Sequence, residues 1–403
     1  MYGLSEGSLS WFRTYLMNRQ QCVQVESAIS KPLDVSHGVP QGSILGPLLF
    51  LIYIMDMPLS IEETESDIEE STSGGIEKAT NDSHIVIYAD DNTPTTAHKN
   101  IDQLKVKIQT DADLTTSWIR DNEMICSGEK TKLLVIGTEQ NQRVNIVEKE
   151  KTLTITVCGK QILESVSEKL LGVVINNTAT WKHMLYGNEK ELGLVKELSK
   201  RVGILRRVRK FMNNNQFRIV ANSMFNSKLI YCINVWGAVW NLPGVLDNQV
   251  RAITSISKED LGRLQVLQNT ILRLQTGLGW FTPTEVLMEK ANQLSVHQLV
   301  AYHSVLQAHK CRKTGEPAYM YDRLFPNVNN VHANRERLRS TTNENISIYF
   351  DLSLSRGSYF FRASRLYNSI PADIKNCPTI SSFKKNLKKW IKEHIAVIPI
   401  TNM

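Results

Sequence analysis

Apolar residues recur every three or four positions in two stretches near the start of the chain, which predicts two helices. One follows Ser5, a favourable N-cap, and places Leu9, Phe12 and Leu16 on one face. The other runs over residues 101–121. Both stretches also carry polar residues on the opposite face, as expected for helices that are half exposed.

Short apolar runs bounded by turn residues predict strands. Two of them, residues 84–87 and 93–96, flank Asp90, Asp91 and Asn92, which favour a turn. We therefore expect a hairpin with two carboxylates at its tip. The other predicted strands cover residues 21–25, 132–136 and 170–175, with a possible hairpin of 144–147 and 153–157.

The longest apolar run, residues 44–55, contains Gly46 and Pro47. It is too short to cross a bilayer, so we expect a buried helix from Gly42 to about Met57. The acidic, Ser/Gly-rich segment 61–82 has too little apolar surface to offset the entropy of ordering, which predicts a flexible loop. A regulatory acidic segment is the alternative.

From about Lys182 the pattern becomes helical. Leu194, Leu198, Val202 and Leu205 form one apolar face, and basic residues occupy the rest of that helix. Mixed strands and helices followed by helices predict an α+β fold. Further predicted helices cover residues 217–240, 261–278 and 284–309; a polar linker covers 326–346 and a basic helix 383–390.

Composition narrows the functional classes. The chain has 403 residues, of which 42% are hydrophobic, and this is enough for two or three domains. Its net charge of +7 moderately favours binding to nucleic acid or another anionic surface. Six scattered cysteines predict neither a zinc finger nor a disulfide framework, and suit a reducing compartment as mostly buried side chains. The histidines show no metal-binding spacing, and the N-terminus shows no signal peptide.

The adjacent Asp90 and Asp91 are the first candidates for chemistry. Two like charges side by side are costly unless a cation neutralises them. Mg²⁺ prefers carboxylate oxygens and retains room for phosphates, and two-metal phosphoryl transfer needs such carboxylates. A solvated acidic turn without any ligand is the alternative.

Four segments in a fixed order carry a family resemblance. They are Gly38–Phe50 (GVPQGSILGPLLF), Tyr88–Asp91 (YADD), Lys130–Leu133 (KTKL) and Leu170–Ile175 (LLGVVI). Together they resemble the palm motifs of reverse transcriptases, most closely those of non-LTR (LINE-like) retrotransposons. The resemblance implies a right-handed polymerase palm followed by a helical thumb, and RNA-directed DNA synthesis with an RNA template, a DNA primer, deoxynucleotides and Mg²⁺.

The resemblance also assigns roles. Asp90 would be the principal metal ligand and Asp91 its support, while Lys130 would reach the triphosphate or protonate the leaving pyrophosphate. Without the resemblance these positions would be ordinary loop, surface or core residues. The remaining assignments are contact with the nucleotide and template for Pro40, Gln41, Gly42 and Tyr88, and the primer grip for Leu171 and Gly172.

A cluster of basic residues on the predicted helix near residue 200 is a candidate for phosphate contact, with Phe211 and Trp390 as possible stacking partners. A solvated charged face is the alternative, since most charged helices contact only water. The cluster consists of Lys200, Arg201, Arg206, Arg207 and Lys210.

One departure from the family pattern concerns the first catalytic aspartate. In the family it lies on a strand ahead of the Tyr-Gly-Leu-Ser segment, which here is Tyr2–Ser5. We therefore expect a truncated copy with two of three palm carboxylates, inactive by itself. A non-catalytic RNA- or DNA-binding remnant and an inert product are the alternatives.

The resemblance divides the chain into three parts. A partial palm covers residues 1–181, a helical thumb and extension covers 182–320, and a linker with a basic C-terminal region covers 321–403. We expect the protein in the nucleus or cytoplasm, neither secreted nor in a membrane. The sequence does not indicate an oligomeric state.

Overall fold

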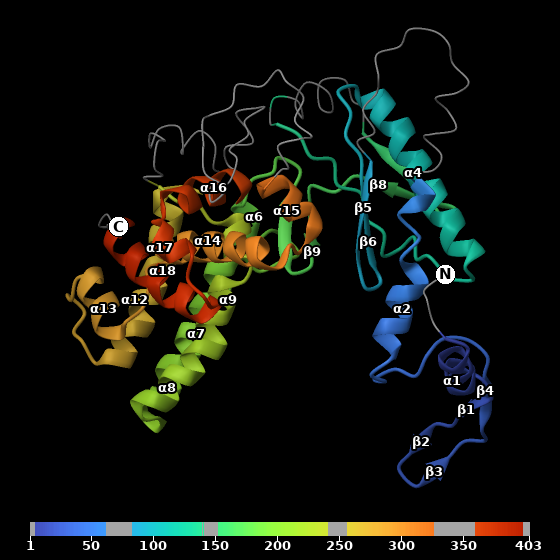
Figure 1. The fold of residues 1–403 in the computed structure, drawn as a ribbon, viewed down its shortest axis with the longest axis horizontal. Coiled ribbons are helices and arrows are strands. Elements are labelled where there is room, and N and C mark those ends of the chain that lie inside the picture. The colour runs from blue at the N-terminus through green and yellow to red at the C-terminus, as the bar shows by residue number, and fades with distance from the viewer. Residues whose placement is uncertain are drawn as a thin grey trace. The chain divides into compact units, whose positions relative to one another are not determined.

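A computed structural model of the chain describes residues 5–61, 83–138, 140, 152–240, 256–325 and 359–397. It mixes helices with small antiparallel hairpins, so the α+β prediction is confirmed (Figure 1). The predicted acidic loop beyond Ile61, the strand 144–147 and the linker 326–346 lie outside the described residues. No helix among the described residues combines the length and the hydropathy needed to span a bilayer.

The chain forms two compact units. The first, here the hairpin unit, comprises residues 1–133 and 145–164, and the second, the helical unit, comprises residues 134–144 and 165–403. The predicted boundaries at residues 181 and 320 stay predictions.

The described residues of the hairpin unit form helices and four antiparallel pairs of strands, and most predicted helix ends are confirmed. Ser5 caps α1 by accepting a hydrogen bond from the Ser8 N–H, and Asn100 caps α4 in the same way. The elements are α1 (Glu6–Leu16), β1 (Arg19–Gln21), β2 (Gln24–Val25), β3 (Ala28–Ile29), β4 (Leu33–Val35), α2 (Gly46–Ile54), β5 (His84–Tyr88), β6 (Asp91–Thr95), α4 (Ile101–Asp121), β7 (Thr154–Val157) and β8 (Lys160–Leu163).

Two predicted strands of this unit were wrong in part. The strand 21–25 is interrupted because the Val23 N–H donates to the Ser30 hydroxyl oxygen and not to a neighbouring strand. The β1–β4 pair is therefore separate from the β2–β3 pair. Residues 132–136 form only a single bridge, between Leu133 and Glu164, although Leu133 is buried. β7 is confirmed and pairs with β8 across a two-residue turn.

The apolar helix α2 is shorter and more exposed than predicted. It begins at Gly46, and within it only Gly46 and Ile54 are fully buried, followed by Met57 and Ile61. Leu51 is 50% exposed. The prediction of a buried helix was wrong because an apolar run shows only that burial is favourable and does not supply a packing partner.

The helical unit starts with one hairpin and continues as helices. Its elements are β9 (Ser167–Leu170), β10 (Val173–Asn176), α6 (Lys182–Tyr186), α7 (Leu194–Val208), η2 (Arg209–Phe211), α8 (Asn214–Ala221), η3 (Asn222–Asn226), α9 (Ser227–Ile230), α10 (Ile233–Trp236), α12 (Lys258–Thr276), α13 (Thr284–Ala291), α14 (Val296–Thr314), α15 (Ala318–Leu324), α16 (Tyr359–Ser369), α17 (Ala372–Lys375) and α18 (Ile380–His394).

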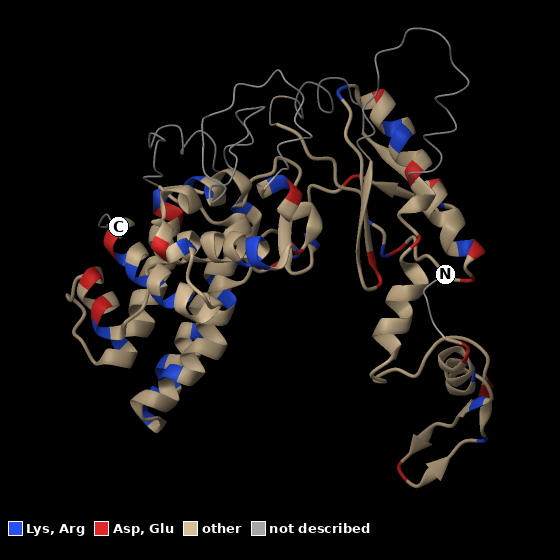
Figure 2. Ribbon diagram, in the orientation of Figure 1, with Lys and Arg blue, Asp and Glu red and all other residues tan. Residues whose placement is uncertain are grey.

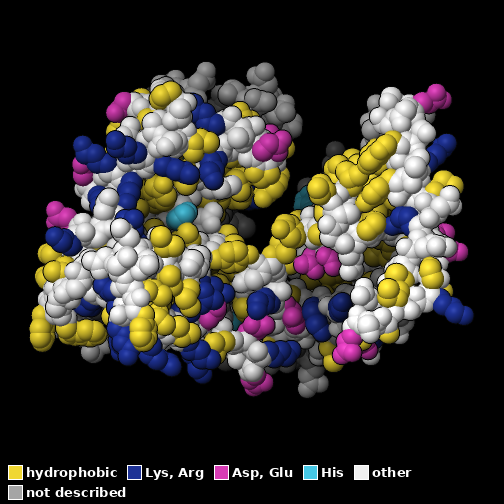
Figure 3. All heavy atoms as spheres, turned by 90° about the horizontal axis from the view of Figure 1, so that it is seen from below, with side chains coloured by type: hydrophobic (Ala, Val, Ile, Leu, Met, Phe, Trp, Pro, Cys, Tyr) yellow, Lys and Arg dark blue, Asp and Glu magenta, His cyan; other side chains and the backbone are white. Residues whose placement is uncertain are grey.

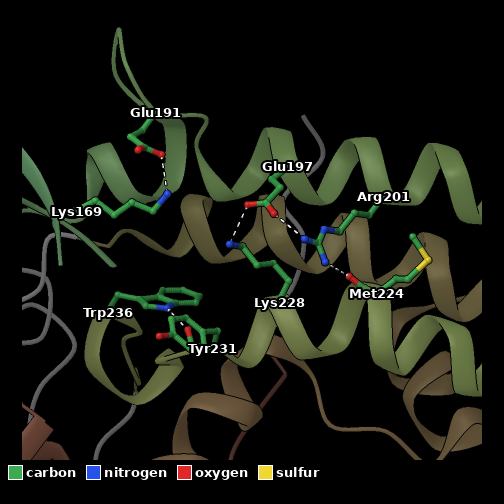
Figure 4. Close-up of polar contacts among 8 residues, drawn as sticks. All are labelled: Lys169, Glu191, Glu197, Arg201, Met224, Lys228, Tyr231 and Trp236. Carbon is green, nitrogen blue, oxygen red and sulfur yellow. Dashed lines mark hydrogen bonds and ion pairs between the residues drawn. The ribbon is translucent and has the colours of Figure 1, made fainter. Parts of the chain in front are cut away.

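One large hydrophobic core fills this unit. It joins the predicted apolar face of α7 to α8, α9, α12, α14, α16 and α18. Trp236 lies in it with no exposed surface, and its indole N–H donates to the Tyr231 carbonyl at 2.9 Å (Figure 4). Because helices from α6 to α18 contribute residues to one cluster, distant parts of the sequence depend on the same packing.

A buried arginine links three segments of this core. Arg362 of α16 donates to the Ser304 hydroxyl of α14 at 3.1 Å, to the Gly237 carbonyl at 2.7 Å and to the Asn234 carbonyl. Burial lowers the pKa of its guanidinium to about 10, and the charge is retained at neutral pH.

Several predicted helices are divided in the structure. Residues 284–309 form α13 and α14, separated at Asn292, which adopts a left-handed conformation. Residues 217–240 form α8, η3, α9 and α10. Segment η3 is a π-helix in which the Ser227 N–H bonds the Asn222 carbonyl five residues back.

Candidate active site and nucleic-acid interface

Asp90 and Asp91 lie at the tip of a regular antiparallel hairpin. β5 and β6 pair from His84 opposite Thr95 to Tyr88 opposite Asp91. The predicted hairpin is therefore confirmed, but its two-residue turn is Ala89–Asp90, one position earlier than expected. Ala89 takes a left-handed φ of 51°, and Asp91 is the first residue of β6. Both carboxylates and the Tyr88 side chain are exposed.

The other end of this hairpin is anchored on α4 by a buried carboxylate. Asp111 accepts hydrogen bonds from the Ser83 hydroxyl at 2.8 Å and from the Thr96 hydroxyl. Ser83 and Thr96 immediately flank the two strands, and Asp111 is almost fully buried. One carboxylate thus fixes both strands of the hairpin to α4 at this end, which leaves the opposite tip free to present Asp90 and Asp91.

Pro40, Gln41 and Gly42 form an exposed turn ahead of α2. The Ser43 N–H donates to the Pro40 carbonyl at 3.2 Å, and Gly42 has a φ of 82°, which a side chain would strain. The Ser43 hydroxyl accepts from the Gly46 N–H at 3.0 Å. The expected position at the mouth of the helix was wrong, because the helix begins only at Gly46.

Lys130 lies in a tight turn whose backbone is closed by the Ser127 carbonyl, which accepts from the N–H groups of Lys130 and Thr131 at 3.1 Å. Its side chain is exposed. Over the residues described, no hydrogen bond or ion pair joins Lys130 to Asp90 or Asp91. The neighbouring Glu129 pairs with Lys160 of β8 at 3.2 Å, which ties this turn to the β7–β8 hairpin.

Two cysteines meet beside this turn. Burial and a hydrogen bond with the Cys158 side chain raise the pKa of the Cys126 thiol. Among the six cysteines, only Cys311 and Cys377 are buried, so the expectation that most would be buried was wrong.

The donor set at the hairpin tip fits a hard cation only in part. Two carboxylates from one turn supply the oxygen chemistry that Mg²⁺ prefers, with open positions for water or phosphate. Among the described residues, no group of three or more histidine, cysteine, aspartate or glutamate side chains is close enough to hold a metal ion. Asp90 and Asp91 could therefore hold one ion loosely, and a two-metal arrangement needs further ligands.

Leu171 and Gly172 form the turn between β9 and β10. Sequence analysis placed them inside a strand; that was wrong, since both take left-handed φ values, 46° and 82°. The Leu171 carbonyl accepts from the Tyr231 hydroxyl at 2.5 Å, and a Cβ on Gly172 would lie 3.2 Å from the Tyr231 ring. Tyr231, which follows α9 in the same unit, thus holds this turn.

The basic cluster on α7 divides into engaged and exposed members. Glu197 accepts from Arg201 at 2.7 Å and from Lys228 at 3.0 Å, and Arg201 also donates to the Met224 carbonyl (Figure 4). Burial opposes ionisation of Glu197, but Lys228 and Arg201 outweigh it and lower its pKa. Side chains remain exposed at Lys200, Arg206 and Arg207 of α7 and at Lys210 of η2. Figure 2 marks the lysine and arginine positions of the ribbon in blue.

The basic C-terminal helix is more engaged than its sequence indicated. Lys388 and Lys392 of α18 donate to Asn292, at its carbonyl (2.6 Å) and its side-chain oxygen (2.9 Å). Trp390 is buried and stacks on His394 at 4.7 Å, so it does not present a face to bases. Phe211, in contrast, is 75% exposed.

Sequence reasoning missed Asp111 and Tyr231. Asp111 occupies an inward position of an amphipathic helix, and a carboxylate at such a position was the signal that could have indicated a buried polar contact. Tyr231 gave no comparable signal, because its partner is a backbone carbonyl 60 residues away.

Comparison with known proteins finds a family model and relatives that are similar to this chain. Residues 3–175 match the model of the reverse transcriptase (RNA-dependent DNA polymerase) family. The chain is 24% identical to a probable RNA-directed DNA polymerase from transposon X-element of Drosophila melanogaster, over 74% of this chain and 29% of the relative. It is 23% identical to the RNA-directed DNA polymerase from mobile element jockey of the same organism, over 68% of this chain and 25% of the relative.

The chain therefore spans less than a third of the length of these two curated relatives. No solved structure matches it. The family match covers the Pro40–Gly42 turn, the Asp90–Asp91 hairpin, Lys130 and the Leu171–Gly172 turn, and ends before α6. Residues 3–175 thus match the reverse transcriptase family, and the chain is similar in sequence to RNA-directed DNA polymerases of transposon X-element and mobile element jockey.

Proposed function

We propose that this chain is part of an RNA-directed DNA polymerase, in which the hairpin unit contributes to the palm and the helices from α6 onward act as a thumb and extension. The observation that carries the proposal is the position of Asp90 and Asp91, exposed at a hairpin tip within the family match. The template would be RNA, the primer DNA and the substrates deoxynucleotides.

In this proposal Asp90 and Asp91 hold Mg²⁺, which would neutralise charge on the incoming triphosphate. Asp111 keeps the hairpin fixed to α4 so that both carboxylates stay in register. Lys130 supplies positive charge for the triphosphate or a proton for pyrophosphate, and the Gln41–Gly42 turn lets backbone approach the nucleotide and template closely.

We further propose that these two carboxylates are insufficient by themselves. In-line displacement with two ions about 3.5–4 Å apart needs ligands from a second direction. Among the described residues none accompanies Asp90 and Asp91. The chain as given would then not extend a primer, and an aspartate on an added strand ahead of Tyr2 would restore synthesis.

Primer extension on an RNA template with Mg²⁺ or Mn²⁺ tests the proposal. Three proteins are compared: the chain as given, a version with a Phe-Asp segment fused ahead of Tyr2, and the Asp90→Ala variant of the fused version. We expect synthesis only by the fused version. Synthesis by its Asp90→Ala variant would refute the assignment of Asp90, and strong synthesis by the chain as given would refute the incomplete site.

A second candidate is nucleic-acid binding without catalysis, favoured by the exposed members of the α7 cluster, Lys200, Arg206, Arg207 and Lys210. Affinity for single-stranded RNA should then fall with salt, with a slope of about −0.7 per phosphate neutralised. Replacing these four residues by alanine should flatten the slope. Binding with an unchanged slope would assign them to a solvated face.

A further inference from the structure

Two segments of the helical unit expose large aromatic rings, and both are held by the last turn of α12. Phe211 ends η2 and is 75% exposed. Trp280 and Phe281 lie in the loop between α12 and α13 and are 62% and 95% exposed. Single exposed hydrophobic residues are common, whereas three such rings on segments tied to one helical turn form a candidate binding surface.

Hydrogen bonds hold the loop of Trp280 and Phe281 to α12. Arg273 donates to the Gly279 carbonyl at 3.4 Å and to the Thr282 carbonyl at 3.2 Å. The Thr282 N–H in turn donates to the Gly279 carbonyl at 3.2 Å, which closes the loop on itself. The two rings are thus displayed by a loop with a defined shape.

The Phe211 segment is tied to the same turn from the other side. Arg209 donates to the Leu274 carbonyl at 2.6 Å and to the Met212 carbonyl at 2.7 Å, so it links α12 to the chain on both sides of Phe211. Arg273 and Leu274 are neighbours in the sequence. Both aromatic segments are therefore attached to the last turn of α12.

Each segment also carries a cation over an aromatic face. The Lys210 ammonium lies 4.9 Å from the centre of the Phe211 ring, and the Arg273 guanidinium lies 4.8 Å from the Trp280 ring. A ring with a cation on one face still offers the other face for stacking. We call Lys210, Phe211, Arg273, Trp280 and Phe281 the aromatic–cationic rim. Figure 3 shows basic and hydrophobic side chains interleaved where the ends of α8 and α13 face the viewer.

We propose that the aromatic–cationic rim binds single-stranded RNA by stacking bases on Phe211, Trp280 and Phe281, while Lys210 and the neighbouring exposed Arg207 contact phosphates. Exposed π-faces beside positive charge suit unpaired bases, whose faces a duplex hides. A protein partner is less favoured, because lysine is depleted at protein interfaces and the chain carries a charge of +7. The rim lies outside the family match and does not depend on polymerase activity.

The test measures fluorescence anisotropy of a labelled oligouridine and of an RNA duplex with the full chain, without nucleotides or metal. Phe211→Ala, Trp280→Ala and Phe281→Ala should each weaken oligouridine binding on the order of tenfold and leave duplex binding almost unchanged. Trp280→Phe should retain most affinity. Tyr319→Ala, which removes a 69% exposed ring from α15, is the matched control and should bind as the parent chain does.

Lys210→Ala should lower the salt slope by about 0.7, whereas the aromatic variants should leave the slope unchanged. Circular dichroism checks each fold, and Phe281→Ala keeps the test valid if loss of Trp280 disturbs the loop.

Unchanged affinity in all three alanine variants, or equal losses on oligouridine and duplex, would overturn the proposal. So would self-association that Phe281→Ala abolishes, since it would assign the rim to a contact between copies. Because the assay contains neither nucleotides nor metal, a failed primer-extension experiment would leave this proposal standing, which separates it from the polymerase proposal.

Discussion

The hairpin unit and the helical unit are stabilised in different ways. All residues of the large hydrophobic core lie in the helical unit, where Trp236, Phe217 and Phe225 have no exposed surface. In the hairpin unit, α2 leaves much of its apolar surface exposed, and the Asp90–Asp91 hairpin depends on a polar anchor at Asp111. Most of the family match lies in the less well packed unit, so the candidate chemistry and most of the packing belong to different parts of the chain.

Trp236→Ala should have the largest effect on stability. It removes a fully buried side chain and its hydrogen bond to Tyr231, so we expect a loss of about 3–5 kcal/mol in the free energy of unfolding. Leu51→Ala on α2 is the comparison, with an expected loss below about 0.5 kcal/mol because this side chain is half exposed. Urea unfolding measures both. Similar losses would show that α2 is packed in solution and would remove the contrast between the units.

Asp111→Ala should have an intermediate effect, confined to the hairpin unit. It leaves the hydroxyls of Ser83 and Thr96 without their acceptor, at a cost of about 1–3 kcal/mol. Hydrogen exchange should then increase in β5 and β6 and stay unchanged in α14. Asp113→Ala on the exposed side of the same helix is the control. Unaltered exchange in β5 and β6 would mean that Asp111 does not hold the hairpin.

Glu197→Gln should have the smallest effect, and it should depend on pH. Because Lys228 and Arg201 lower the folded-state pKa of Glu197 despite its burial, its stabilising contribution is fully present above the unfolded-state pKa of about 4.3. That contribution is lost as the pH falls through the folded-state pKa. We expect the variant to lose roughly 1 kcal/mol at neutral pH and the difference to disappear in acid.

Urea titrations of both proteins from neutral to acidic pH measure this difference, with Glu189→Gln as the control. A difference that stays constant down to acid would mean that the ion pairs with Lys228 and Arg201 do not stabilise the folded state.

The sequence predicted helices well where caps were present. The side-chain oxygens of Ser5 and Asn100 each accept a hydrogen bond from an N–H in the first helical turn. This interaction is local, so the residue type before the helix is enough to predict it. Strands were harder. The run 170–175 is apolar across a turn, so its pattern is the same whether Leu171 and Gly172 continue a strand or reverse it. The left-handed backbone conformation of both residues, seen only in the structure, shows that they form a turn.

Within the candidate site, the sequence predicted the hairpin that carries Asp90 and Asp91 but not what holds it. The tip depends on alternation and turn residues, which are local. The anchor at Asp111 depends on a contact between α4 and the hairpin, and Arg201 is held by contacts with Glu197 and with the Met224 carbonyl. The pattern of a single sequence does not show which helix faces pack against which other elements. For the same reason the exposure of α2 could not be foreseen.

The π-helix η3 has a consequence for chain length. Its wide turn accommodates one more residue than an α-helix of the same rise, and the Met224 carbonyl within it accepts from Arg201. Deleting one residue from Asn222–Asn226 would allow a regular α-helix from α8 to α9. Residues beyond that deletion would keep their orientation around the helix axis, because the wide turn already absorbs the extra residue. A deletion in the regular turns of α8 would instead rotate all later residues by about 100°, which would turn Lys228 away from Glu197. The π turn is therefore the position at which this helical segment can lose a residue and still keep Lys228 facing Glu197.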